Sequence, residues 1–176
     1  MEVQHVKGSA RLLSLSLTNS RIEAGETFAP LELQALLTAP WSAATPEQKL
    51  KQAILLYPQL PLDIHLDASQ RMLTSEQWTD PAQLRLVVID GSWRKSRKML
   101  YLNPLLQCLP RLCLDDLAAS KYLIRKAHRP EQLSSFEATC AALMQLEGAN
   151  EKFANLLAGF DGFVQQQIQA MPSLMK

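Results

Sequence analysis

The stretch from Leu84 to Leu102 constrains the fold of this 176-residue chain more than any other. An apolar run ending in Leu86-Val87-Val88-Ile89 is followed by Asp90-Gly91-Ser92-Trp93 and then by a basic segment with helical periodicity. A short β-branched run of this kind predicts a strand buried on both faces, and Gly91 permits an unusual turn conformation. Ser92 is placed to cap the helix that follows. The segment therefore predicts a strand, a tight turn and a helix.

The same turn predicts a ligand site. Asp90 follows the carboxyl end of the predicted strand, which is where α/β proteins place their ligands. Backbone N–H groups at the start of the next helix favour carboxylates and phosphates. The first two turns of that helix carry four cations, namely Arg94, Lys95, Arg97 and Lys98.

Strand and helix patterns alternate along the rest of the chain, which has no repeats. This alternation predicts an α/β fold with a three-layer, mostly parallel sheet. Further strands are expected at residues 11–18, 53–57, 111–114 and 121–124. Helices are expected at 30–38, from Ser134 through 147 with a capping box to Glu137, and from about 151 to 170. Residues 61–80 read as irregular.

Length and cysteine content fit one cytoplasmic domain, expected over residues 1–176. A chain of this length buries about 70% of its extended surface, so it can form a core without cross-links. The chain has three cysteines, an odd number, and each lies in or beside an apolar run: Cys108, Cys113 and Cys140. This pattern predicts free and mostly buried thiols. No signal peptide or membrane-spanning run of ~20 apolar residues is apparent, so no membrane partner is expected.

The net charge of +1 hides a basic middle of the chain. From Arg94 to Arg129 there are nine lysines and arginines against two aspartates. Such a segment predicts an RNA surface that contacts phosphates, whereas the alternative is an ordinary solvated helix face. The residues expected to bind RNA are Arg94, Lys95, Arg97, Lys98, Lys126 and Arg129.

The chain resembles the DTW-domain family of tRNA-uridine aminocarboxypropyltransferases, whose naming motif D-x-T-W stands at the end of a strand. The motif here is Asp90-Gly91-Ser92-Trp93, in which Ser92 keeps the hydroxyl of the family threonine. Other segments match the family in the same order: Leu55-Leu56-Tyr57-Pro58, Asn103-Pro104, residues 120–126 and residues 133–138, with a weaker match at 8–13. The family's N-terminal cysteine cluster is absent, so no metal site is expected.

The resemblance implies a SPOUT-like fold with a C-terminal trefoil knot whose loops hold S-adenosylmethionine. The implied reaction moves the 3-amino-3-carboxypropyl group of S-adenosylmethionine to N3 of a uridine in tRNA and releases methylthioadenosine. Loops at the carboxyl ends of strands converge on the cofactor in such a fold. The residues then expected to bind it are Leu56, Tyr57, Pro58, Ile89, Gly91, Ser120, Tyr122, Arg125 and Ser135.

The motif residues Asp90, Ser92 and Trp93 are expected to carry the chemistry. Asp90 would accept the N3 proton or orient N3 through a hydrogen bond, and its alternative role is a turn or helix cap. Ser92 would bind the cofactor carboxylate, cap the helix, or do both. Trp93 would stack on adenine or on the target base, or else belong to the core. Arg125 would meet a carboxylate or phosphate with two hydrogen bonds, or else be a surface arginine without a role.

Two other functions remain open from the sequence. A SPOUT-like methyltransferase would use the same cofactor and release S-adenosylhomocysteine. A non-catalytic RNA-binding protein would keep the basic segment without the chemistry. The chain has no G-x-S-x-G, P-loop or G-x-G-x-x-G motif, which removes the commonest hydrolase, NTPase and Rossmann assignments. The sequence leaves the oligomeric state open.

Overall fold

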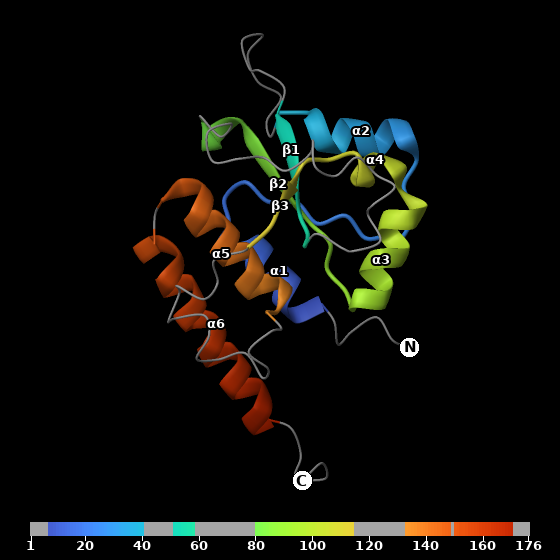
Figure 1. Ribbon diagram of the computed structural model, residues 1–176. Coiled ribbons are helices and arrows are strands. Elements are labelled where there is room, and N and C mark those ends of the chain that lie inside the picture. The colour runs from blue at the N-terminus through green and yellow to red at the C-terminus, as the bar shows by residue number, and fades with distance from the viewer. Residues whose placement is uncertain (1–6, 41–50, 59–79, 115–132, 149, 171–176) are drawn as a thin grey trace.

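The computed structural model describes residues 7–40, 51–58, 80–114, 133–148 and 150–170. At its centre lies a three-stranded parallel sheet with the order β2-β1-β3 (Figure 1). The strands are β1 (Gln52–Leu56), β2 (Leu84–Val88) and β3 (Arg111–Leu112). Because all three strands are parallel, their carboxyl ends lie along one edge of the sheet. The strand predicted at 53–57 and the strand predicted directly before the motif turn, Asp90-Gly91-Ser92-Trp93, are thus confirmed.

Helices account for most of the other described residues. They are α1 (Lys7–Ser16), α2 (Pro30–Thr38), α3 (Trp93–Leu102), α4 (Pro104–Gln107), α5 (Ser135–Glu147) and α6 (Asn150–Ala170), with a short 3-10 turn, η4, at Pro81–Gln83. Pro30 and Pro104 stand in the first turns of their helices, where a missing N–H costs nothing. The predicted capping box between Ser134 and Glu137 opens α5, and Gly148 ends that helix in the left-handed conformation.

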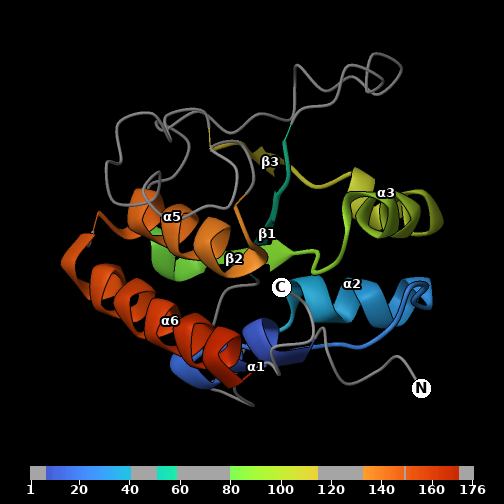
Figure 2. The same cartoon turned by 90° about the horizontal axis from the view of Figure 1, so that it is seen from below.

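The central strand β1 is buried on both faces by different helices. Ala53, Leu55 and Tyr57 pack in one cluster with side chains from α2, α3 and α4. Ile54 points to the other side and packs with Leu112 and with Ala142 of α5. Figure 2 shows α2 and α3 on one side of the strands and α5 and α6 on the other. Helices therefore cover both faces of the parallel sheet, which confirms the α/β prediction.

A second cluster lies on the side of α5 that faces away from the sheet. There Phe136 stacks on Phe160 of α6, with ring centroids 4.1 Å apart and an interplanar angle of 9°. Leu12 and Leu13 of α1 pack against the same cluster. Helix α5 thus packs against the sheet on one side and against α1 and α6 on the other.

A buried arginine links the sheet to α2. Arg85 of β2 donates hydrogen bonds to the backbone carbonyls of Leu36 and Ala39, at the C-terminal end of α2. Carbonyls at this end of a helix lack partners within the helix. Burial lowers the pKa of the Arg85 guanidinium, and the charge of Arg21 lowers it further. Arg85 therefore acts as a cap for α2.

The expected strand at 11–18 is wrong, because these residues belong mainly to helix α1. A strand would place Leu13, Leu15 and Leu17 on one face, whereas Leu15 is 77% exposed. Leu12, Leu13 and Leu17 instead pack against α5 and α6. The alternating pattern is compatible with a strand or a helix, and packing against α5 and α6 decides in favour of the helix.

Other expectations are corrected or lie outside the described residues. The strand expected at 111–114 is shorter, since β3 ends at Leu112. The three cysteines are free, but Cys108 is exposed rather than buried and Cys113 is only partly buried. The strand expected at 121–124 lies outside the described residues, so the SPOUT-like fold and the knot stay predictions. None of the helices that the structure describes is long and apolar enough to cross a membrane.

Candidate active site

The carboxyl edge of the sheet brings together the ends of all three strands. Strand β1 continues into Tyr57 and Pro58, β2 into Ile89 and the motif turn, and β3 into Cys113. The connections beyond residues 58 and 114 lie outside the described residues. The turn between β2 and α3 is therefore the one connection at this edge that lies wholly within the described residues.

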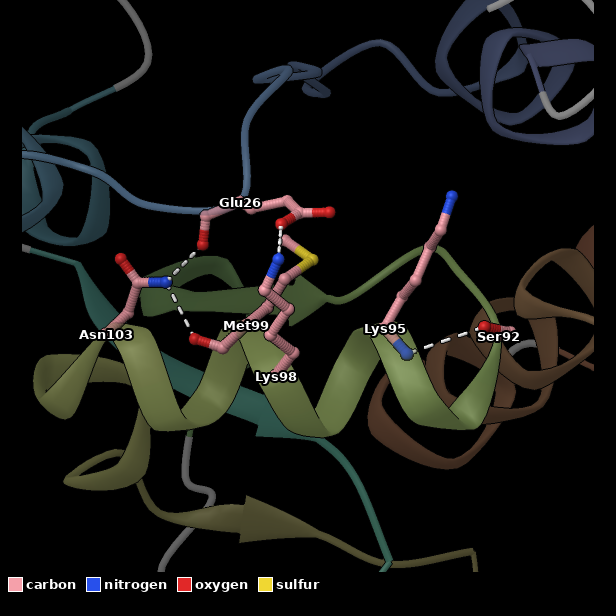
Figure 3. Close-up of polar contacts among 6 residues, drawn as sticks. All are labelled: Glu26, Ser92, Lys95, Lys98, Met99 and Asn103. Carbon is pink, nitrogen blue, oxygen red and sulfur yellow. Dashed lines mark hydrogen bonds and ion pairs between the residues drawn. The ribbon is translucent and has the colours of Figure 1, made fainter. Parts of the chain in front are cut away.

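The motif turn has the conformation expected from its sequence. Gly91 has a φ of 158°, a value that residues with a side chain rarely adopt, and a Cβ there would lie 3.4 Å from Cβ of Lys95. Ser92 is the N-cap of α3, and its Oγ accepts a hydrogen bond from the backbone N–H of Lys95 at 3.4 Å (Figure 3). The backbone N–H groups of Trp93 and Arg94 precede the first N–H that can bond within the helix. The exposed carboxylate of Asp90 lies just before these donors.

A buried hydrogen-bond network joins the end of β1 to the first turn of α3. Tyr57 and Ser96 are each 4% exposed, and their hydroxyl oxygens lie 3.1 Å apart. Ser96 donates its only hydroxyl proton to the backbone carbonyl of Trp93 at 3.0 Å. It follows that Tyr57 donates to Ser96. The network holds the start of α3 against the central strand.

Trp93 lies partly against the protein and partly in solvent. Its ring meets the Tyr57 ring edge to face, with centroids 5.7 Å apart and an angle of 75°. The residue is nevertheless 53% exposed. Trp93 is thus neither a core residue nor a free side chain, and it can stack on a ligand while Tyr57 supports it. Tyr57 is itself buried, so its ring supports Trp93 rather than facing solvent.

Arg111 lies beside the candidate site although it is not among the site residues predicted from the sequence. It is 7% exposed, and its guanidinium carbon lies 5.7 Å from the centroid of the Tyr57 ring. Its Nη1 donates to the carbonyl of Pro58 at 3.4 Å, and the thiol of Cys113 contacts the carbonyl of Tyr57 at 3.6 Å. The available signal was a charged residue within the apolar run Leu109–Leu114, since a buried cation needs partners.

The remaining predicted residues divide into three groups. Leu56 and Ile89 pack against the cores on opposite faces of the sheet. Ser135 opens α5, on the face of the sheet opposite to α3, and its carbonyl accepts a hydrogen bond from Thr139. Outside the described residues lie Ser120, Tyr122, Arg125, Lys126 and Arg129.

The four predicted cations of α3 are all exposed, but one has a partner within the chain. Lys98 Nζ lies 2.5 Å from Oε2 of Glu26, in the segment before α2 (Figure 3). The hydrogen bond and charge of Lys98 lower the pKa of the Glu26 carboxyl, and Lys95 contributes a smaller effect. An anionic ligand that binds Lys98 would therefore compete with the Glu26 carboxylate for its ammonium group. No described acidic residue pairs with Arg94 or Arg97.

Comparison with known proteins identifies the family. The family model of the DTW domain matches residues 1–168, which include both β1 and the turn before α3. No curated protein and no solved structure matches the chain. The match covers far more than half of the chain, and it spans the Asp90-Gly91-Ser92-Trp93 turn on which the described site is built. The chain therefore belongs to the DTW-domain family, a membership consistent with a tRNA-modifying function.

Proposed function

We propose that the protein is a transferase that moves the 3-amino-3-carboxypropyl group of S-adenosylmethionine to N3 of a uridine in tRNA. Membership of the DTW-domain family supports a tRNA-modifying function. The observation that carries the proposal further is the motif turn itself. It combines an exposed carboxylate, free helix N–H groups and a half-exposed indole at the carboxyl edge of a parallel sheet.

These groups fit the chemistry of the proposed co-substrate. The half-exposed indole of Trp93 suits stacking on a purine ring, and the N–H groups at the start of α3 suit the carboxylate of an amino acid. The carboxylate of Asp90 attracts a sulfonium cation. S-adenosylmethionine supplies an activated γ-carbon bonded to that sulfonium sulfur.

The proposed transfer needs one proton acceptor. The N3–H proton of the uridine passes to Asp90, N3 bonds to the γ-carbon, and the carbon–sulfur bond breaks. The electron pair of the broken bond stays on the sulfur of the departing methylthioadenosine. Asp90 is exposed at the strand end, so it can reach a base that has left its stack.

The buried residues behind the turn would act by positioning. Tyr57 and Ser96 fix the first turn of α3, while Arg111 packs over Tyr57 and bonds to Pro58. Displacement of a reacting group by about 1 Å can cost about 100-fold in rate. We therefore assign to these residues the orientation of Trp93 and of the helix N–H groups.

Mass spectrometry tests the proposal directly. Transfer RNA is incubated with the protein and S-adenosylmethionine, digested to nucleosides and analysed together with the small-molecule products. The expected products are 3-(3-amino-3-carboxypropyl)uridine and methylthioadenosine. A methylated nucleoside with S-adenosylhomocysteine would replace the proposal with methyl transfer. If the protein bound tRNA but all nucleosides stayed unmodified, the result would favour the alternative of a non-catalytic RNA-binding protein.

A further inference from the structure

The outer face of α3 presents an aromatic ring among cations, away from the motif turn. Residues three, four and seven positions apart lie on the same side of a helix. This spacing relates Arg94, Arg97, Lys98 and Tyr101, which define the outer face of α3. All four are exposed, and Tyr101 is 80% exposed. The opposite side of the helix is buried against the sheet core through Leu100.

The position of Tyr101 is unusual for an aromatic residue. The large exposed apolar side chains among the described residues include two aromatic ones, Trp93 and Tyr101, and both belong to α3. Eight residues separate them, which corresponds to about 12 Å along the helix axis. A short single-stranded segment can span this distance. The helix therefore carries one exposed ring at the candidate site and another near its far end.

The charges around Tyr101 indicate which partner fits. Arg94 and Arg97 have no acidic partner among the described residues, whereas Lys98 at the edge of the face pairs with Glu26. An apolar ring alone would suit a protein partner, but a ring on the same helix face as two cations without a described acidic partner suits a polyanion with aromatic bases. Proteins that bind single-stranded nucleic acids combine these features, because cations contact phosphates while bases stack on aromatic rings.

We propose that Tyr101 is a stacking platform for an unpaired nucleotide of the RNA substrate, whose flanking phosphates contact Arg94 and Arg97. This inference rests on the proposed function in that the partner is RNA. It adds a contact that takes no part in the chemistry. It also implies that the target uridine lies in a single-stranded loop, with a neighbouring unpaired base about 12 Å away along α3.

Equilibrium binding of a labelled single-stranded RNA and of a duplex of the same length tests this. Replacement of Tyr101 by alanine should weaken binding of the single strand by about 10-fold, since stacking of one base contributes ~1–3 kcal/mol. The dependence of affinity on salt should not change, because no charge is lost. Tyr101→Phe keeps the ring and should bind like the wild type. The matched control is Leu31→Ala on α2, because Leu31 is 81% exposed and lies outside the outer face of α3.

Replacement of both Arg94 and Arg97 by alanine should give the complementary result. Single-strand affinity should fall, and the slope of log affinity against log salt should flatten by about 1.4. Wild-type affinity of Tyr101→Ala would overturn the proposal, and so would equal losses in Tyr101→Ala and Tyr101→Phe. A change in sedimentation of Tyr101→Ala without loss of RNA binding would assign the face to protein association instead. These binding measurements do not require catalysis. A protein that fails to modify tRNA in the nucleoside assay can therefore still confirm or contradict the role of Tyr101.

Discussion

Ser96 has a single hydroxyl proton and two hydrogen-bond partners. The proton goes to the carbonyl of Trp93, and the oxygen accepts from Tyr57. Both side chains are buried, so each lost partner leaves a polar group without water to replace it. The two hydroxyls are therefore unequal, because removal of Ser96 leaves the Tyr57 hydroxyl without an acceptor.

We predict that Ser96→Ala destabilises the protein more than Tyr57→Phe. Loss of the Tyr57 hydroxyl removes one hydrogen bond, which costs about 1 kcal/mol in the free energy of unfolding. Loss of the Ser96 hydroxyl leaves the buried hydroxyl of Tyr57 without an acceptor, which costs about 1–3 kcal/mol in the free energy of unfolding. Urea unfolding of the two variants and of the double variant measures both costs and their coupling. Equal costs that add in the double variant would contradict the proposed direction of donation.

We predict that Asp90→Asn lowers the rate of modification but not the affinity for tRNA. An amide cannot take up the N3 proton, and proton transfer of this kind contributes about 10²–10⁴-fold. Asp90 lies before α3, whereas the cations expected to contact phosphates lie within the helix, so the salt dependence of binding should be unchanged. Single-turnover rates and filter binding at several salt concentrations measure the two effects. A full rate in Asp90→Asn would reduce Asp90 to a turn residue.

Helix α3 is fixed at both ends by side chains that bond to backbone. Ser92 caps its start, and Asn103 follows its last residue. The Asn103 side chain is 2% exposed, donates to the carbonyls of Met99 and Glu26 at 2.7 and 2.8 Å, and accepts from the N–H of Phe28 at 3.0 Å. It thereby holds the segment before α2 beside the helix, as Figure 3 shows. This contact places the Glu26 carboxylate next to the cations of α3.

We predict that Glu26→Gln tightens tRNA binding and steepens its salt dependence. The substitution removes the negative charge that competes with phosphates for Lys98. Glu32→Gln is the matched control, because Glu32 is an exposed acid in the first turn of α2 and loses the same charge. Filter binding at several salt concentrations compares the two variants. Equal gains in both would indicate a general effect of net charge rather than release of Lys98.

The ion pair between Glu26 and Lys98 also has a defined dependence on pH. The pKa of the Glu26 carboxyl in the folded protein is below its ordinary value of 4.5, so the contribution of the ion pair to stability is present above about pH 4.5. It is lost as the pH falls through the lowered pKa. The wild type should therefore lose its stability advantage over Glu26→Gln in acid.

At the scale of the whole molecule, α5 connects two packed regions and contains a buried thiol. Cys140 of α5 is fully buried, and its side chain belongs to the cluster that α5 forms with α6. Burial, with a smaller effect from Glu137, raises the pKa of this thiol to about 12. Cys108, in contrast, is exposed. The two thiols should therefore differ in reactivity and in their effect on stability.

We predict that the wild type loses stability in alkali in a way that Cys140→Ala does not. The unfolded thiol releases its proton near pH 9.0, whereas the folded one keeps it up to about pH 12. The contribution of Cys140 is therefore present below pH 9.0 and is lost as the pH rises towards 12. Urea unfolding at several pH values measures the difference, with Cys108→Ala as the control. In the native protein a thiol reagent should label Cys108 before Cys140, and the opposite order would contradict the burial.

Local patterns predicted much of this architecture. The strand, turn and helix around the motif, the helix α2 and the capping box of α5 follow from residues that are neighbours in sequence. The helix α1 did not follow, because its leucines fit either period, and only packing of Leu12 and Leu13 against α5 and α6 distinguishes the two. Arg111 did not follow either, because its place over Tyr57 depends on the pairing of β3 with Leu55 of β1. Such pairing between distant segments leaves no local signal.

The parallel arrangement of the sheet has a consequence for how the chain folds. The strand pairings among the described residues all join segments far apart in sequence, and the hydrogen bond from Phe28 to Asn103 joins residues 75 positions apart. Long loops must therefore close before these contacts stabilise the chain, and the entropy of closure is lost first. Folding rates fall as the mean sequence separation of contacts rises. Although helices predominate among the described residues, we expect the protein to refold more slowly than an all-helical domain of similar size.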